Sequence, residues 1–505
     1  MTEFAQLVNL ASERLGGAVV TASDEFFAPK ENLLKAAKPI FIEDKHTDRG
    51  KWMDGWETRR RRIPGHDWCI IRLGLPGILR GVIVDTSFFR GNFPPHCSIE
   101  ACAAGGSTFA EELTSSNTIW REVLSKSELR GDTENSFSIA DPHRCTHLRF
   151  NIYPDGGVAR LRVHGEVLPD WRQVLAPGKD INLAAIEHGG RALACSDMFY
   201  SAPQNLLMPY AADNMGDGWE TKRRRGPGHD WAILKLGIAG EIHRIEVDTA
   251  HFKGNFPESC SLEACVASGE ATADALASRD WQAILPRTQL GPDRLHIFEK
   301  ELRRVASSTH VRFNIFPDGG VSRLHIFGQP TKEGRASEAL RFLNSLDPAA
   351  ARAELLNCCG SATWVDVISK SAPFAGTHQL IEKMESAFAS LQKGDWLEAF
   401  RHHPRLGEKK SPAETSSRAK SWSEQEQSGI SGAQAGVVAE LAAANRAYED
   451  RFGYIFIVCA SGKSAAEVLS MLRQRMSNSP EAELGIAAGE QRKITRLRLE
   501  KLLNL

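Results

Sequence analysis

One long stretch of the chain occurs twice, and this duplication limits the folds that the chain can adopt. The segment DGWETRRRRIPGHDW at 54–68 returns as DGWETKRRRGPGHDW at 217–231, and the same offset of 163 residues carries 84–102 onto 247–265. Upstream the offset is 173 residues, so the first copy holds ten additional residues before Asp54. A period of about 160 residues is too long for a solenoid. We interpret the first two thirds of the chain as a duplicated domain.

Each copy carries the pattern of short antiparallel strands. Runs such as LRVH at 161–164 alternate apolar and polar residues, which is the two-residue period of half-buried strands. The turn sequence PDGG, at 154–157 and again at 317–320, combines proline and glycine as hairpins do. Strands of this kind predict two tandem antiparallel β-sandwiches of jelly-roll type, at 1–172 and 173–330.

The periodicity becomes helical after a polar stretch at 329–336, which we interpret as a domain boundary. Beyond it, apolar residues recur at spacings of three and four. This pattern predicts helices at 337–346, 376–392, 433–451, 463–475 and 481–503. A short apolar run at 456–460, between Gly453 and Gly462, is predicted to be extended. The expected fold class is therefore two β-sandwiches followed by a separate all-α domain at 337–505.

Composition restricts the partners of the chain. A formal charge of −1 gives no global attraction to nucleic acid or to an anionic membrane, so a small molecule is the expected partner. No window reaches the roughly 18 apolar residues of a membrane helix, and the first residues lack a signal-peptide core. We expect a cytoplasmic homo-oligomer whose ten cysteines are mostly buried free thiols.

Two polar residues in the helical part have plain structural explanations. His403 precedes Pro404 at the predicted end of a helix, where a histidine commonly serves the helix dipole, although its titration range suits acid–base catalysis. Glu424 follows Ser421 at the spacing of a capping box, so it can stabilise the start of a helix. The residue pattern alone favours structural roles for both.

Arg498 is more informative than either of these residues. In the predicted last helix it shares a stripe with Ile494 and Leu502, whereas Arg492 and Arg496 lie on a different, solvent-facing stripe. An arginine on an apolar face needs an anionic partner, because a buried unpaired charge is costly. The pattern therefore predicts a buried, paired Arg498.

Four separated motifs in the helical part resemble the 2-oxo-4-hydroxy-4-carboxy-5-ureidoimidazoline (OHCU) decarboxylases of urate degradation. They are HHPRLG, SWSEQEQSG, NRAYEDRFGYIFIVCASGKSAAEVL and EQRKITRLRLEKLL. The resemblance runs from about residue 340 to the end, and it implies that His403, Glu424 and Arg498 carry the reaction. The substrate contacts that it implies come from Pro404, Ser421, Gln425, Phe456, Ile457, Val458, Cys459 and Ala460.

This decarboxylation needs no cofactor, because the electron pair left by carbon dioxide is delocalised into the imine-like ring of the substrate. The protein has only to bind and orient the substrate and to protonate the product of carbon dioxide loss. A cationic Arg498 can hold the anionic substrate, while His403 and Glu424 can bind its polar groups and deliver a proton to one face, which gives (S)-allantoin. We predict no cofactor, and the sequence does not decide which of the two groups donates the proton.

The duplicated part resembles allantoicase, whose double repeat carries blocks of the DGWETRRRR, GHDW and GNFP type. This resemblance covers nearly all of 1–328. It implies jelly-roll, galactose-binding-like domains that hydrolyse allantoate to ureidoglycolate and urea. Such a substrate calls for a cation near its carboxylate and for acid–base groups near the leaving nitrogen. The candidates are Glu57, Arg59, His66, Asp67 and Glu100 in the first copy, and Glu220, Lys222, His229, Asp230 and Glu263 in the second.

Alternatives stay open for the duplicated part. Residues kept in both copies can hold the sandwich together, and tandem sandwiches can act as a non-catalytic ligand- or partner-binding module for the helical enzyme. No metal-ligand motif is present, so no metal site is predicted, and the metal dependence of this half stays open. The hydrolase that opens the allantoin ring is absent from the chain. We therefore expect the fusion to secure co-expression, or docking with a separate allantoinase.

Overall fold

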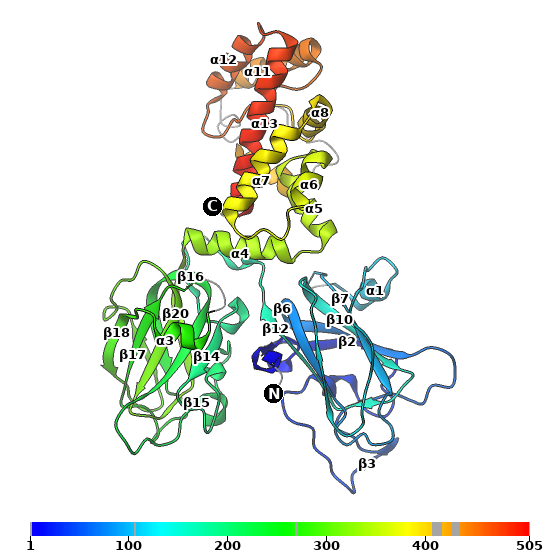
Figure 1. The fold of residues 1–505 in the computed structure, drawn as a ribbon, viewed down its shortest axis with the longest axis vertical. Helices are drawn as coiled ribbons and strands as arrows, with labels where there is room; N and C mark the ends of the chain where they lie inside the picture. Colours follow the sequence, from blue (N-terminus) through cyan, green and yellow to red (C-terminus); the bar gives the residue numbers. More distant parts are fainter. Residues whose placement is uncertain are drawn as a thin grey trace. The chain divides into compact units, whose positions relative to one another are not determined.

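The computed structural model describes residues 3–105, 108–176, 178–267, 271–406, 417–426 and 435–503. The chain divides into two compact units, Met1–Gly334 and Arg335–Leu505 (Figure 1). The first unit holds the duplicated part, and the second holds the helical part.

The first repeat is an antiparallel β-sandwich built around one long strand, β6 (Asp67–Asp85). Its first half pairs with β2 (Ala18–Ala22) and β10 (Arg144–Tyr153), and its second half pairs with β9 (Glu134–Ser138) and β12 (Arg160–Val167). The remaining strands of the sheet are β1 (Val8–Asn9), β7 (His96–Cys102) and β8 (Arg121–Glu128), in the order β1-β12-β6-β10-β7-β8. Strand β6 thus contributes to both layers.

The second repeat has the same strand order, which confirms two tandem sandwiches. Its long strand is β16 (Asp230–Asp248), and the sheet runs β13-β22-β16-β20-β17-β18, with β14 and β19 also paired to β16. Their bounds are β13 (Ile181–Asn182), β14 (Arg191–Cys195), β17 (Ser259–Cys265), β18 (Gln282–Gln289), β19 (Leu295–Phe298), β20 (Ser308–Phe316) and β22 (Arg323–Pro330). The short helices of the unit are η1 (Glu3–Gln6), η2 (Glu13–Leu15), η3 (Lys30–Leu34), α1 (Ala110–Thr114), α2 (Trp171–Val174), η4 (Ile186–His188), η5 (Pro203–Leu207), η6 (Met215–Asp217) and α3 (Ala273–Ala277).

The last glycine of each PDGG turn begins a short strand that pairs with the repeated DGWET segment. Strand β11 (Gly157–Val158) pairs with β5 (Trp56–Glu57), and β21 (Gly320–Val321) pairs in the same way with β15 (Trp219–Glu220). Gly156 has a φ of 145°, and a Cβ atom there would lie 2.6 Å from the backbone nitrogen of Pro94. Glycine is therefore required at this turn both by conformation and by space.

The ten additional residues of the first repeat form a hairpin that the second repeat lacks. Strand β3 (His46–Thr47) pairs with β4 (Gly50–Lys51), and both strands are exposed. The hairpin is tied to the sandwich because Arg49 Nη1 donates to the Phe26 carbonyl at 2.9 Å. In the second repeat the shorter connection forms the single turn η6.

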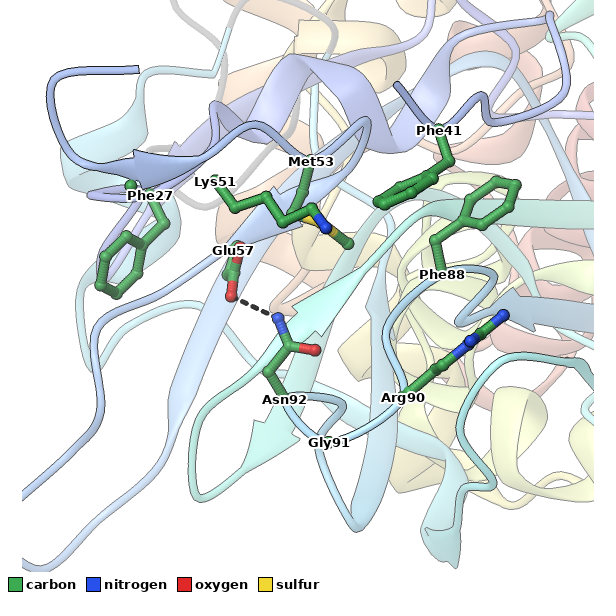
Figure 2. A pocket seen from close by; sticks show the side chains of 10 residues that line it. Phe27, Phe41, Lys51, Met53, Glu57, Phe88, Arg90, Gly91 and Asn92 are labelled. Atoms are coloured by element: carbon green, nitrogen blue, oxygen red, sulfur yellow. Dashed lines mark hydrogen bonds between the residues drawn. The ribbon is translucent and has the colours of Figure 1, made fainter. Parts of the chain in front are cut away.

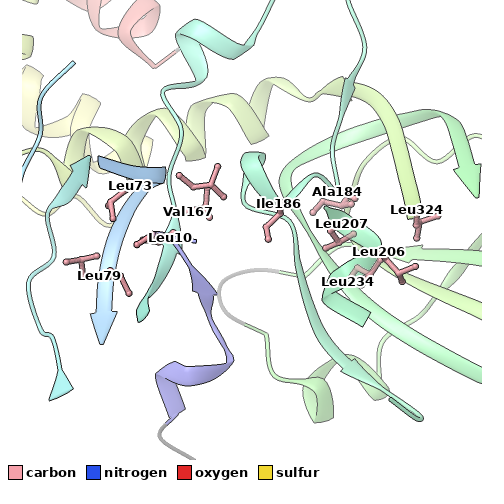
Figure 3. Close-up of a cluster of buried hydrophobic side chains, with 14 of the residues drawn as sticks. Leu10, Leu73, Leu79, Val167, Ala184, Ile186, Leu206, Leu207, Leu234 and Leu324 are labelled. Carbon is pink, nitrogen blue, oxygen red and sulfur yellow. The ribbon is translucent and has the colours of Figure 1, made fainter. Parts of the chain in front are cut away.

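A continuous buried apolar cluster contains side chains of both repeats. Figure 3 shows part of it, with Leu10, Leu73 and Val167 from the first repeat and Ile186 and Leu206 from the second. An ion pair of 2.7 Å between Arg14 and Asp217 also joins the repeats. All ten cysteines are free and eight are buried, as predicted.

The second unit is helical, as predicted. Its longest helix, α13 (Pro480–Leu502), contacts α5 (Pro348–Cys358), α7 (Thr377–Ser390) and α8 (Lys393–Arg401). The other helices in the described part of this unit are α4 (Lys332–Ser345), α6 (Ala362–Ser369), α9 (Ser417–Glu426), α11 (Ala435–Phe452) and α12 (Ala465–Arg475). The segment 456–460 is in neither helix nor strand.

The polar stretch at 329–336, which we interpreted as a domain boundary, contains the division between the two compact units, but it is not a loop. Strand β22 runs to Pro330 and helix α4 begins at Lys332, so one residue separates the elements. The Thr331 backbone N–H donates to the Ala239 carbonyl at 2.9 Å, which fixes this residue to the sandwich. The polar residues belong to the end of a strand and to the first turn of a helix, in which Lys332 and Glu333 are exposed.

In the described parts of the chain, no helix is both long enough and apolar enough to cross a membrane.

Candidate active sites

Residues from four segments line a pocket in the helical unit. Its walls come from the turn after α8, from α9, from the extended segment 456–461 and from α13. The lining residues are His403, Pro404, Leu406, Ser423, Glu426, Phe456, Ile457, Val458, Cys459, Ala460, Ser461, Ile494 and Leu497. The predicted residues His403, Pro404 and 456–460 all lie here.

Arg498 lies beside this pocket in a buried ion pair. Its side chain is 4% exposed, and the guanidinium donates to both carboxylate oxygens of Glu426 at 2.9 and 3.1 Å and to Ser423 Oγ at 2.9 Å. Ile494 and Leu502 are buried on the same face of α13. The predicted burial and anionic pairing of Arg498 are confirmed, and the anion is Glu426.

His403 is held in its neutral form. Burial, followed by the nearby Arg498 charge, lowers the pKa of its imidazole to about 3. Near neutral pH the ring can therefore accept a proton and can donate only as a neutral N–H group. The helix-dipole explanation needs a charged imidazole, so it does not describe this residue.

Three predicted residues do not lie in the pocket. Ser421, Glu424 and Gln425 are exposed on α9, whereas Ser423 and Glu426 are buried. Glu424 therefore does not line the pocket, whereas Glu426 does. The predicted capping box is wrong because α9 begins at Ser417, so Ser421 lies within the helix. The sequence contains the Ser-x-x-Glu-Gln pattern twice, as SWSEQ at 421–425 and as SEQEQ at 423–427, and the buried face of the helix carries Ser423 and Glu426 of the second match.

Side chains from three helices form hydrogen bonds to the backbone of the extended segment 456–460. The sequence did not predict any of these contacts. The Asn445 side-chain oxygen accepts from the Phe456 N–H at 3.0 Å, and Glu490 accepts from the Cys459 N–H at 2.8 Å. Arg475 donates to the Ile457 carbonyl at 2.9 Å and pairs with buried Glu483 at 2.6 Å. These side chains replace the strand neighbours that the segment does not have.

In the sandwiches, the aspartates of the GHDW motif have structural partners. Asp67 is buried, pairs with Arg61 at 2.9 Å and accepts from Ser23 Oγ at 3.1 Å. Its counterpart Asp230 is likewise buried and pairs with Arg224. Both aspartates fix the start of the long strand.

The residue that directly follows DGWET is paired with an acid in both repeats. Arg59 pairs with Asp24 at 2.6 Å, and Lys222 pairs with Asp197 at 3.3 Å. These cations already have carboxylate partners within the protein.

The GHDW histidines belong to a polar cluster on the outer face of each sheet. His66 Nε2 lies 3.3 Å from Asn151 Oδ1, and Asn151 Nδ2 donates to Glu100 at 3.1 Å. Burial tends to raise the pKa of Glu100, but the hydrogen bonds from Arg149 and Asn151 bring it below its ordinary value. His229, Glu263, Arg312 and Asn314 repeat the cluster in the second repeat.

Glu57 lies in a different place, in a pocket of about 390 Å³ in the first repeat. Figure 2 shows the Asn92 side-chain N–H donating to Glu57 Oε1, a distance of 2.6 Å. Burial raises the pKa of Glu57 above its ordinary value, against this hydrogen bond. The other lining residues are Phe27, Phe41, Gly50, Lys51, Met53, Phe88, Arg90 and Gly91. Glu220 keeps the same bond in the second repeat, to Asn255.

The ten candidates of the duplicated part therefore separate into distinct sets of contacts, and within the described part of the chain no hydrogen bonds or ion pairs join all of them in one site. Within the described ranges, no group of three or more His, Cys, Asp and Glu side chains is placed to hold a metal ion.

Family comparisons agree with this division of the chain. The model of the allantoicase repeat matches residues 8–168 and 181–331, and that of OHCU decarboxylase matches 344–500. The chain belongs to the allantoicase family. Its helical unit is an OHCU decarboxylase domain, so this allantoicase-family chain is a bifunctional enzyme of purine catabolism.

Individual relatives of this allantoicase-family chain match its first two thirds. A probable allantoicase of Pseudomonas paraeruginosa is 51% identical over 328 residues, which are 65% of this chain and 97% of the relative. The allantoicase of Dictyostelium discoideum is 48% identical over 323 residues, 64% of this chain and 87% of the relative. The crystal structure of allantoicase from Saccharomyces cerevisiae superimposes with a TM-score of 0.54 at 36% identity, and covers 65% of this chain and 96% of that one.

Proposed function

We propose that the first unit hydrolyses allantoate to ureidoglycolate and urea, and that the helical unit decarboxylates OHCU to (S)-allantoin with His403, Glu426 and Arg498. The observation that carries the second assignment is the buried pocket in which α9 places Glu426 against Arg498 and beside His403. We propose no cofactor for either reaction. A homo-oligomer and docking with a separate allantoinase remain part of the proposal.

The geometry supports distinct roles for the two acid–base groups. Glu426, which accepts two hydrogen bonds from Arg498, can also accept hydrogen bonds from the ureido and hydroxyl groups of the substrate. Neutral His403 can take the proton of the ring hydroxyl and return it to the adjacent carbon after carbon dioxide leaves. This relay produces the ketone of allantoin. The ring nitrogen that receives the electron pair takes one proton from water, so decarboxylation of the carboxylate consumes one proton overall. A bound anionic substrate would raise the pKa of His403 toward the range that proton transfer needs.

The decarboxylase assignment is tested by Glu426→Gln in the full chain. We expect allantoin formation from freshly generated OHCU to fall by about 10²-fold, in the range of a lost acid–base or charged contact. Glu424→Gln, two residues earlier on the exposed face of α9, is the matched control and should stay within about twofold. Equal rates in the two variants would remove Glu426 from the reaction.

The hydrolase assignment is tested by urea release from allantoate, measured on the full chain by a coupled urease assay. We expect one urea and one ureidoglycolate per allantoate. Binding of allantoate without urea release would instead support the non-catalytic ligand-binding module.

A further inference from the structure

The two repeats differ most where the ten additional residues of the first repeat lie. The pocket that contains Glu57 is partly walled by this insertion, since Phe41, Gly50 and Lys51 all belong to the segment 35–53. The corresponding connection in the second repeat, 208–216, is ten residues shorter. The wall is fixed in place: Phe41 stacks on Phe88 with ring centroids 5.5 Å apart.

In the second repeat the connection packs onto the equivalent residues. Met215 Sδ lies 3.7 Å from the side-chain nitrogen of Asn255, which is the counterpart of Asn92. His251, the counterpart of Phe88, has its Nε2 atom 2.8 Å from the Ala212 carbonyl oxygen. The shorter loop therefore occupies positions that the first repeat leaves to the pocket.

From this difference we infer that the first repeat alone holds the allantoate site, in the pocket of Glu57, Asn92 and Lys51, and that the second repeat is a structural copy. The inference deepens the proposed function and rests on it. It assigns Glu57 as the acid–base residue, Lys51 as the cation for the carboxylate, and Asn92 and the apolar wall as the contacts of the ureido groups.

The pocket has the chemical groups that this substrate needs. Lys51 Nζ lies 4.5 Å from the centre of the Phe41 ring, and within the described residues no carboxylate is paired with it, so its charge is available to an anion. The aromatic side chains and Met53 can cover a planar ureido group and exclude water (Figure 2). In the outer-face cluster, by contrast, Arg149 is already bound by both oxygens of Glu100 at 2.6 Å.

Glu57 is suited to act as an acid and then as a base. Its burial favours the protonated carboxyl, which can give a proton to the nitrogen of the leaving ureido group while the carbon–nitrogen bond breaks and its electron pair stays on that nitrogen. The remaining ureido nitrogen then forms a double bond to the central carbon. Water adds to this carbon and gives its proton to the Glu57 carboxylate. Allantoate and one water thus become urea and ureidoglycolate, and Glu57 ends protonated as it began.

The decisive experiment compares Glu57→Gln with Glu220→Gln in the full chain. Glutamine can still accept the hydrogen bond from the asparagine in either repeat, so both variants should keep the fold, as checked by circular dichroism and the thermal midpoint. We expect kcat for urea release from allantoate to fall by about 10²-fold or more for Glu57→Gln and to change by less than about twofold for Glu220→Gln. Similar losses in both variants, or the larger loss for Glu220→Gln, would overturn the inference.

A second pair of variants tests the insertion. Lys51→Met should raise KM for allantoate by about tenfold or more through the lost charged contact, whereas Lys45→Met should not, since Lys45 lies in the same insertion but outside the pocket lining. An unchanged KM for Lys51→Met would overturn the role of the insertion. If the unaltered chain released no urea from allantoate, the proposed function would fail instead, so the two failures are distinguishable.

Discussion

At the scale of single residues, the buried Arg498–Glu426 pair connects stability with catalysis. Glu426 also pairs with Lys501, at the longer distance of 3.5 Å. If Arg498 is removed, the buried carboxylate loses its bidentate partner, and breaking a buried pair in this way is costly. The pair therefore stabilises the helical unit as well as shaping the pocket.

We predict that Arg498→Met lowers the free energy of unfolding of the helical unit by about 3 kcal/mol and also abolishes most decarboxylation. Arg496→Met is the matched control, because Arg496 is half exposed and its ion pairs with Glu385 and Glu500 lie at the surface. That control should cost less than about 1 kcal/mol. Guanidinium unfolding, followed by hydrogen exchange within α13, measures the free energy of unfolding of both variants. Equal losses of this free energy in the two variants would contradict the prediction.

His403 gives a pH dependence whose sign is fixed by its lowered pKa. The folded imidazole has a pKa of about 3, whereas an unfolded histidine titrates near 6.5, at about its ordinary value. Between these values the unfolded chain binds a proton that the folded chain does not, so this contribution is fully present above about pH 6.5 and is lost as the pH falls.

The corresponding prediction is that His403→Asn reduces the loss of stability between pH 8 and pH 5. The free energy of unfolding of the original chain should fall more steeply over this range than that of the variant, because asparagine does not titrate. Guanidinium titrations at several pH values measure the two slopes. Parallel slopes would show that His403 is not held neutral by the fold.

At the scale of elements, the extended segment 456–460 shows how a wall of a pocket can be built without a sheet. Its backbone groups are bound by side chains of Asn445 on α11, Arg475 on α12 and Glu490 on α13. Each such bond satisfies a backbone group that would otherwise be unpaired after burial. The segment can therefore present its backbone and side chains to a substrate in one fixed conformation.

We predict that Glu490→Ala impairs decarboxylation although Glu490 does not line the pocket. Loss of its acceptor leaves the Cys459 N–H unsatisfied, at a cost of about 1 to 3 kcal/mol, so kcat/KM should fall by roughly tenfold or more. Glu440→Ala, which removes a surface partner of Arg473, is the control and should leave the rate unchanged. Partial rescue by Glu490→Gln, which keeps one oxygen acceptor, would identify a positioning role.

At the scale of the whole molecule, the boundary between the units decides which fragments are independent. Helix α4 begins at Lys332, two residues before the first unit ends, and its Leu340 and Leu343 are buried in the apolar core of the helical unit. The helix should therefore be kept intact when the chain is divided.

We predict that a fragment of residues 332–505 folds in one cooperative transition and retains decarboxylation of OHCU, because its core and the pocket residues are internal to it. A fragment of 337–505 lacks the first turn of α4 and should unfold at a lower guanidinium concentration. Calorimetry and allantoin formation measure these outcomes. An insoluble or inactive 332–505 fragment from an active full chain would contradict independence.

The sequence by itself determined what depends on local pattern. Duplication, two-residue alternation and turn residues specified two sandwiches, and helical periodicity specified the long helices and the inward face of Arg498. These properties can be read from a single sequence because each is set by geometry within one element.

Only the tertiary structure decided which residues meet. Two overlapping Ser-x-x-Glu-Gln matches differ by two positions, and the buried face of α9 brings Glu426, not Glu424, to Arg498. The sequence also marked Asp67 and Glu57 alike as repeated acids, yet one is neutralised by Arg61 and the other lies in a pocket beside the insertion. The physical reason is that charge pairing, burial and pocket walls depend on partners distant in sequence, and no local period encodes those partners.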